Sequence, residues 1–214
     1  MLNSSMKNLI KFDDSIRDML IGCLLGDAHI GVSGGNKAFI TFEQTTKHEG
    51  YIMSIYQALK NAGVGLHDIK YYSRKDSRYN SVNGSIYFKT HNSELLFPLA
   101  SMFLSEGSKI LPLGIEQYLT PRALAFWICD DGQLVKRGGI TLCTDNYTLA
   151  EVELLIQVLA NKYNAKCSIH YKKGRADRLY HRIYIGKNSF DNIKPLITQY
   201  VHPSFLYKLH KENI

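Results

Sequence analysis

Hydrophobic positions in the first half of the chain recur first at helical spacing and then at every second residue, as in strands. The same helical and alternating patterns then occur again in this half. An acidic cluster at 13–15 provides a helix cap before the first apolar run, and glycines at 34–35 provide a hairpin turn. The predicted elements are a helix over 16–27, strands over 29–32 and 37–44, a helix over 46–62, strands over 68–74 and 85–90, and a helix over 94–104.

The second half of the chain predicts the same order of elements. Thr148 and Ser189 are the expected caps of its second and third helices. The predicted elements are a helix over 120–130, strands over 133–136 and 139–144, a helix over 149–163, strands over 166–172 and 180–187, and a helix over 190–200.

This repeat predicts an α+β fold made of two tandem αββαββα units, because one supersecondary unit used twice packs against its own copy. We expect a first unit over 1–107, a linker over 108–119 and a second unit over 120–214.

Two short apolar runs each end in a carboxylate beside a small residue, at 21–28 (IGCLLGDA) and at 125–132 (AFWICDDG). A carboxylate at the end of a buried helix is costly unless a cation or a donor compensates for its desolvation. The helix dipole also disfavours negative charge at that end. Asp131 follows Asp27 by 104 residues. The two acids therefore predict a shared metal site.

These stretches resemble the signature of the LAGLIDADG homing endonucleases in their single-chain form with two motifs, with Asp27 and Asp131 at the metal-binding positions. The resemblance implies two motif helices packed at a pseudo-twofold axis and antiparallel strands that form a saddle over the DNA. Gly22 and Gly26 have the spacing that lets two helix backbones approach closely. The residue that matches Gly22 in the second motif is Phe126, which departs from this pattern.

The second motif allows two alignments with the first. If its small residues Ala125 and Cys129 match the two glycines, Asp130 is the metal-binding acid. The Asp-Gly ending of the family motif favours Asp131 instead. Asp130 would then offer its backbone carbonyl to the metal, as Gly26 would in the first motif.

The resemblance also implies cofactors and further catalytic residues. Lys109 and Lys208 fall where the family places a basic residue near each scissile phosphate. The implied cofactor is Mg²⁺ or Mn²⁺, which activates water and offsets phosphate charge, whereas Ca²⁺ is expected to support binding without efficient cleavage. The histidines show no metal-ligand spacing, so zinc chemistry is not predicted.

The 214-residue chain carries 26 Lys and Arg against 19 Asp and Glu, a formal net charge of +7 that favours a polyanion ligand. Alternation along a strand puts one set of side chains on one face, where Arg and Gln can reach bases and Lys can reach phosphates. The expected DNA-binding residues are Lys37, Gln44, Lys70, Arg74, Lys75, Arg78, Lys89, Lys136, Arg137, Lys172, Lys173, Arg175, Arg178, Arg182 and Lys187.

Four cysteines without paired spacing lie in or beside apolar runs, and we interpret them as reduced core residues of an intracellular protein. No apolar stretch reaches the roughly 18 residues of a membrane span, and we expect no membrane partner and no export signal. The resemblance implies a monomer encoded in an organellar intron, in a mitochondrion more than in a chloroplast.

The expected function is a homing endonuclease that hydrolyses both strands of a long asymmetric DNA target, and the resemblance implies short 3′ overhangs. One alternative is an RNA maturase with intron RNA as its partner, or a non-catalytic DNA-binding protein on the same scaffold. A further alternative is a purely structural scaffold whose acids are satisfied by internal bonds. The presence of both acids and both lysines favours the nuclease.

Overall fold

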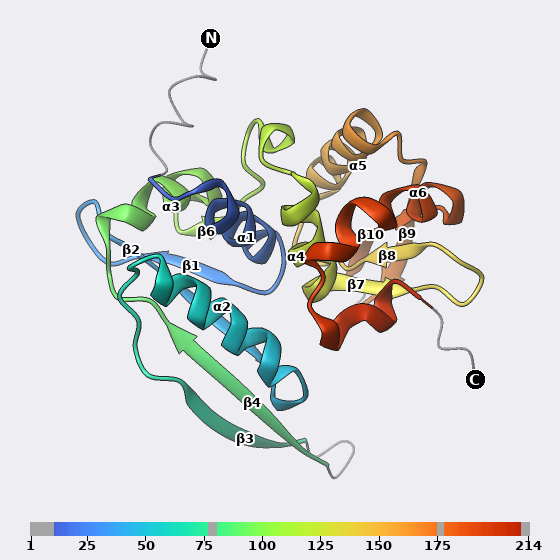
Figure 1. Cartoon of the computed structure of the whole chain (residues 1–214). Coiled ribbons are helices and arrows are strands. Elements are labelled where there is room, and N and C mark those ends of the chain that lie inside the picture. Colours follow the sequence, from blue (N-terminus) through green and yellow to red (C-terminus); the bar gives the residue numbers. More distant parts are fainter. Residues whose placement is uncertain (1–10, 77–80, 175–177, 211–214) are drawn as a thin grey trace. The chain divides into compact units, whose positions relative to one another are not determined.

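The computed structural model describes residues 11–76, 81–174 and 178–210 and divides into two compact units (Figure 1). The first unit contains the chain up to Leu20 and Asp27–Ile110. The second unit contains Ile21–Gly26 and the chain from Leu111 onward, so the end of the first helix is grouped with the second unit.

The first unit carries a four-stranded antiparallel sheet with the strand order β1-β2-β4-β3. Two helices, α2 and α3, pack on it. Its elements are α1 (Asp14–Leu25), β1 (His29–Val32), β2 (Ala38–Thr45), α2 (Glu49–Asn61), β3 (Lys70–Asp76), β4 (Ser81–Lys89), α3 (Phe97–Phe103), β5 (Leu104–Ser105) and β6 (Ser108–Lys109).

The second unit carries a sheet of the corresponding order, β7-β8-β10-β9, which is also antiparallel. Its elements are α4 (Pro121–Asp131), β7 (Gly132–Leu134), β8 (Ile140–Leu142), α5 (Leu149–Tyr163), β9 (Cys167–Lys173), β10 (Leu179–Ile185) and α6 (Lys187–Ile197). The predicted α+β fold with a duplicated αββαββα order is confirmed.

Each sheet has a face covered by helices and an outer face. In the first unit, Ile40 and Phe88 are fully buried, and Tyr56 of α2 contacts Phe88 with 5.1 Å between the ring centres. Helix α2 packs on this face of the sheet (Figure 1). Thr41 and its strand partner Lys89 lie on the opposite, outer face because side chains alternate along a strand. In the second unit, Leu142 and its partner Ile183 are buried on the covered face.

Two predicted helix caps are confirmed and one is wrong. The Asp13 carboxylate accepts hydrogen bonds from the backbone N–H of Ser15 at 2.8 Å and of Ile16 at 3.0 Å. Thr148 forms a complete capping box with Glu151 at the start of α5. Ser189 is not a cap: α6 already begins at Lys187, and the buried Ser189 hydroxyl accepts from the N–H of Lys166 at 2.8 Å.

Two chain segments differ from the predicted elements. Helix α1 ends at Leu25, so Asp27 lies in the following turn and not on the helix. The segment 104–109, part of which was expected to be a loop, forms the small hairpin β5–β6. Its turn needs positive φ angles at Glu106 (50°) and Gly107 (78°), and a glutamate in that conformation is not a sequence signal for a turn. No helix in the described part of the chain is long and apolar enough to cross a membrane.

Candidate active site and nucleic-acid face

The first acid, Asp27, is exposed in the turn after α1 and is held by the sheet of its own unit. The side-chain amide of Gln44 on β2 donates a hydrogen bond to the Asp27 carboxylate at 3.0 Å. Gln44 was expected to contact DNA, but it shares the covered face of β2 with Phe42 and points to the acid instead.

Lys109 lies beside this acid in the first unit. The β5–β6 hairpin carries it, and its ammonium group donates to the backbone carbonyl of Ala28 at 3.1 Å. Ala28 directly follows Asp27 in the chain. The structure therefore brings Lys109, Gln44 and Asp27 together, as a cation, an amide and a carboxylate in one unit.

The second acid, Asp131, is the last residue of α4 and is half-buried. The indole N–H of Trp127 donates to its carboxylate at 3.3 Å from one helical turn earlier. A cavity of about 530 Å³ opens beside the acid, and its polar lining includes Asp130, Gln133, Cys143, Tyr207 and Lys208.

Lys208 is 7% exposed and closes the end of the helix that carries this acid. Its ammonium group donates to the backbone carbonyls of Ile128 at 3.2 Å, Cys129 at 2.5 Å and Asp130 at 3.2 Å. The last carbonyls of a helix have no partner within the helix, and the helix dipole favours a cation there. The Asp130 carbonyl, expected to face a metal, accepts from Lys208 in this structure.

The glycines of the first motif lie against the second motif helix within the second unit. A Cβ atom added to Gly22 would lie 2.6 Å from the Cβ of Phe126, and one added to Gly26 would lie 2.6 Å from the Cβ of Asp130. Each glycine thus faces the residue 104 positions later in the chain. This offset favours the alignment in which Asp131 is the second acid.

Two cysteines near the second acid remain protonated thiols. Burial raises the pKa of Cys129 to about 12, and burial also raises the pKa of Cys143. The expectation that all four cysteines lie in the core holds for Cys23 and Cys129, whereas Cys143 and Cys167 are half-buried; none of the four forms a disulfide.

Four of the basic residues predicted to contact DNA lie on the outer faces of the two sheets. Lys70 and Lys89 lie on the outer face of the first sheet, and Lys172 and Arg182 lie on the outer face of the second. The ammonium group of Lys89 lies 3.4 Å from the centre of the Phe39 ring on the same face. These residues form two basic faces that also carry aromatic rings, which is the composition expected of a surface that contacts nucleic acid.

Several of the other predicted DNA contacts do not lie on these faces. Lys173 points to the covered side of β9, and Lys187 begins α6, so its assignment to a strand was wrong because the helix starts earlier than expected. The remaining positions are Lys37 in the β1–β2 turn, Lys136 and Arg137 in the β7–β8 turn, Arg74 and Lys75 on β3, Arg178 just before β10, and Arg78 and Arg175 outside the described residues.

Arg182 forms a bidentate salt bridge on the outer face, which the sequence did not indicate. Its guanidinium group donates to the two carboxylate oxygens of Asp145 at 2.6 and 2.5 Å. The hydrogen bond that Arg182 donates to Asp145 raises the pKa of Arg182 despite partial burial, so Arg182 keeps its charge. Asp145 lies in a short turn after β8, where no hydrophobic periodicity predicts which way its side chain points.

Trp127 and Tyr207 are further site residues that the sequence reasoning missed. Trp127 precedes Asp131 by four residues, a spacing that places two side chains on one side of a helix and could have indicated the contact. Tyr207 adjoins Lys208 and lines the same cavity as Asp131. Burial raises the pKa of Tyr207, so its hydroxyl stays protonated at neutral pH.

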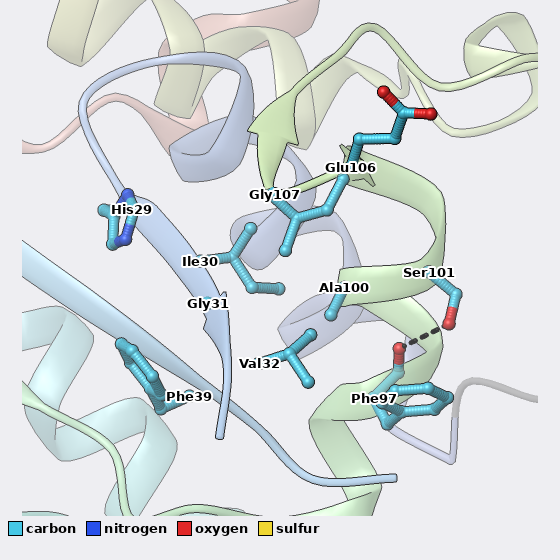
Figure 2. Close-up of a pocket in the computed structure, with 11 residues that line it drawn as sticks. His29, Ile30, Gly31, Val32, Phe39, Phe97, Ala100, Ser101, Glu106 and Gly107 are labelled. Carbon is cyan, nitrogen blue, oxygen red and sulfur yellow. Dashed lines mark hydrogen bonds between the residues drawn. The ribbon is translucent and has the colours of Figure 1, made fainter. Parts of the chain in front are cut away.

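Another cavity, of about 550 Å³, lies in the first unit beside β1 and α3 (Figure 2). Apolar side chains such as Ile30 and Val32 line much of it, and the Ser101 hydroxyl at its edge donates to the Phe97 carbonyl at 3.1 Å. None of the predicted site residues lines this cavity.

The donor atoms at the two acids suit a hard cation. Asp27 and Asp131 offer carboxylate oxygens, and Mg²⁺ prefers oxygen ligands while keeping several waters. In the ranges that the structure describes, no group of three or more His, Cys, Asp or Glu residues could hold a metal. A cation at either acid would therefore need water or phosphate oxygens to complete its coordination shell.

Sequence comparison identifies relatives along nearly the whole chain. A cytochrome b mRNA maturase bI2 from Debaryomyces hansenii is 32% identical over 198 residues, which cover 92% of this chain and 74% of the relative. A probable intron-encoded endonuclease 1 from Wickerhamomyces canadensis is 29% identical, with 90% and 82% covered. The chain spans about half, 49%, of a longer maturase relative.

Structural comparison agrees with the sequence. The homing endonuclease I-WcaI bound to its DNA recognition sequence is similar with a TM-score of 0.81 and 25% identity, and the match covers 97% of this chain and 93% of that chain. The model of the LAGLIDADG DNA endonuclease family matches residues 17–193, more than half of the sequence. The protein therefore belongs to the LAGLIDADG DNA endonuclease family.

Proposed function

We propose that the protein is a site-specific homing endonuclease that cuts both strands of a long asymmetric DNA target with Mg²⁺ or Mn²⁺. The observation that carries this proposal is the matched environment of the two acids. In each unit, a side-chain N–H donor bonds the carboxylate, and a lysine bonds a backbone carbonyl next to it.

The chain's own groups divide the work of phosphodiester hydrolysis. Asp27 and Asp131 would hold the cations through their carboxylates, and Gln44 would orient the first of them. When bound, the cations supply an activated water, neutralise charge on the phosphate and stabilise the leaving 3′ oxygen. Lys109 would offset phosphate charge in the first unit, and Lys208 would fix the helix end in the second.

The outer faces of the two sheets would hold the duplex. Lys70, Lys89 and Lys172 would contact phosphates, and Arg182, oriented by Asp145, would reach a base edge or a phosphate. This assignment is supported by the net charge of +7 and by the DNA recognition sequence that I-WcaI binds. The protein would act as a monomer, with units over 1–107 and 120–214 joined by a linker over 108–119.

A second function, as an RNA maturase, is supported by the maturase from Debaryomyces hansenii, which is similar over 92% of this chain. In that case intron RNA would be the partner, and RNA splicing would not require the two acids. The cytochrome b in that relative's name also supports an origin in a mitochondrial intron.

The test is a selection from a randomised library of long DNA duplexes, incubated with the purified chain and Mg²⁺, Mn²⁺ or Ca²⁺. We expect double-strand ends around one long consensus in Mg²⁺ or Mn²⁺, and binding of the same consensus without efficient cutting in Ca²⁺. A consensus that is bound but never cut in any of these ions would contradict the nuclease and leave the maturase as the function to test.

A further inference from the structure

Trp127 is the one tryptophan of the chain, and it is fully buried in the second unit. A buried indole N–H needs an acceptor, because its desolvation is otherwise uncompensated. The acceptor is the carboxylate of Asp131, 3.3 Å away. A carboxylate oxygen can accept this bond and still bind a cation, because each oxygen carries two lone pairs.

The donor to the second acid comes from a different element than the donor to the first. Gln44 reaches Asp27 from β2, whereas Trp127 reaches Asp131 from the same helix, four residues earlier. The indole is rigid and packed on all sides, so its N–H has a fixed direction. It therefore restricts the carboxylate of Asp131 more than a flexible glutamine could.

At the strand position that matches Gln44, the second unit has a threonine. Thr41 and Thr141 each pair with the strand residue two positions after the acid of their unit, so they correspond to each other. Three positions further on, Thr144 stands where Gln44 stands in the first unit. Thr144 is buried and its hydroxyl donates to the His181 carbonyl at 2.5 Å. The Asp131 carboxylate accepts from the Trp127 indole, and the side-chain oxygen of the nearby Gln133 accepts from Arg182 at 3.4 Å.

We propose that Trp127 is the positioning residue of the second acid: it directs the Asp131 carboxylate toward the cation and makes this half of the site unequal to the half at Asp27. The inference rests on the proposed function, because the cation is the one that the nuclease requires. Outer-shell donors of this kind commonly change metal affinity or activity by about 10- to 100-fold when removed.

The first experiment uses the indole as a reporter and does not depend on cleavage. Tb³⁺, a hard ion that seeks oxygen ligands as Ca²⁺ does, is added to the full chain, and indole-sensitised terbium emission is recorded at wavelengths that tyrosine does not absorb. We expect saturable emission for the unmodified chain and a loss of about tenfold or more for Asp131→Asn. No emission, or equal emission from Asp131→Asn, would overturn the inference.

The second experiment measures nicking of each strand of the selected target. Trp127→Phe removes the N–H and keeps an aromatic ring, and we expect cutting of one strand to fall about tenfold while the other stays within about twofold. Phe190→Leu, another fully buried aromatic residue of the second unit, is the control for a loosened core. An equal effect on both strands, or none, would overturn the positioning role.

These two experiments separate the inference from the proposed function. If the unmodified chain binds the target and never cuts it, the nuclease proposal fails, and the terbium emission alone decides whether a cation at Asp131 lies beside the indole. If the unmodified chain cuts the target and Trp127→Phe cuts each strand at the same rate as the unmodified chain, the nuclease proposal stands and the positioning role fails.

Discussion

The ammonium nitrogen of Lys208 lies 2.5 Å from the backbone carbonyl oxygen of Cys129, in the buried end of α4. The matching lysine of the first unit, Lys109, is half-buried and donates to the carbonyl of Ala28. Both lysines therefore bond the backbone next to an acid, but Lys208 bonds three carbonyls of a helix end. We infer that it stabilises the fold more than Lys109 does.

Replacing Lys208 with Met should lower the free energy of unfolding by about 2–3 kcal/mol, because three carbonyls lose a charged donor inside the protein. Lys109→Met is the matched comparison and should cost less than about 1 kcal/mol, since its group is more accessible to water. Denaturant unfolding of both variants measures the difference. Equal losses would contradict the assignment of Lys208 to the helix end.

Gly22→Ala should destabilise the protein by about 1–3 kcal/mol, because an added methyl group has no space in this packed contact. Its Cβ would lie 2.3 Å from the carbonyl oxygen of Ala123, and backbone atoms cannot move aside easily. Gly186→Ala is the control, since its Cβ would be 3.4 Å from the nearest atom. Thermal unfolding measures both, and a Gly22→Ala variant as stable as the control would show that the helices are not in close contact there.

Lys172 and its neighbour Lys173 give a test of which sheet face binds DNA. Lys172→Gln should weaken DNA binding and lower the slope of log affinity against log salt by about one, because one phosphate contact is lost. Lys173 is also exposed but points to the other face, so Lys173→Gln should leave that slope nearly unchanged. Binding measured over a range of salt concentrations checks this. The reverse order of effects would place the DNA on the covered face.

Glu151 should make stability depend on pH in the acid range. Burial alone would raise its pKa, but hydrogen bonds from the N–H groups of Leu111 and Thr148 outweigh burial and lower it from the ordinary value of 4.5. A lowered pKa in the folded state gives stability at pH above 4.5 that is lost as the pH falls through the folded value.

Unfolding of Glu151→Gln at several pH values measures this contribution. The variant should be less stable than the unmodified chain at neutral pH, and the difference should shrink toward zero in acid. Glu153→Gln, at an exposed position of the same helix, is the control. A difference that stays constant with pH would show that the charge of Glu151 is not involved.

The sequence predicted elements best where local signals agree. Helix α5 has the predicted bounds 149–163, because Thr148 and Glu151 form a capping box that can be read from the chain. Strand β1 also has its predicted bounds, 29–32. The β5–β6 hairpin was missed because its turn uses a glutamate at positive φ, which has no local signature.

The site contacts depend on packing between distant segments. Lys208 could be identified from its place in the repeat, but its partners lie about 80 residues earlier, and no sequence period predicts which carbonyls it reaches. Gln44 was predicted to contact DNA from its residue type and its place on a predicted strand. In the structure its amide donates to Asp27 in the turn after α1, a contact between distant segments that no sequence period indicates.

The most direct test of the central claim compares Asp27→Asn and Asp131→Asn with the unmodified chain on the selected DNA target in Mg²⁺. Asparagine keeps the size and the hydrogen-bond acceptor of the side chain but removes the charge that anchors a cation. The account predicts that both variants bind the target as the unmodified chain does and that neither makes double-strand breaks. Double-strand cutting by either variant at the unmodified rate would contradict it.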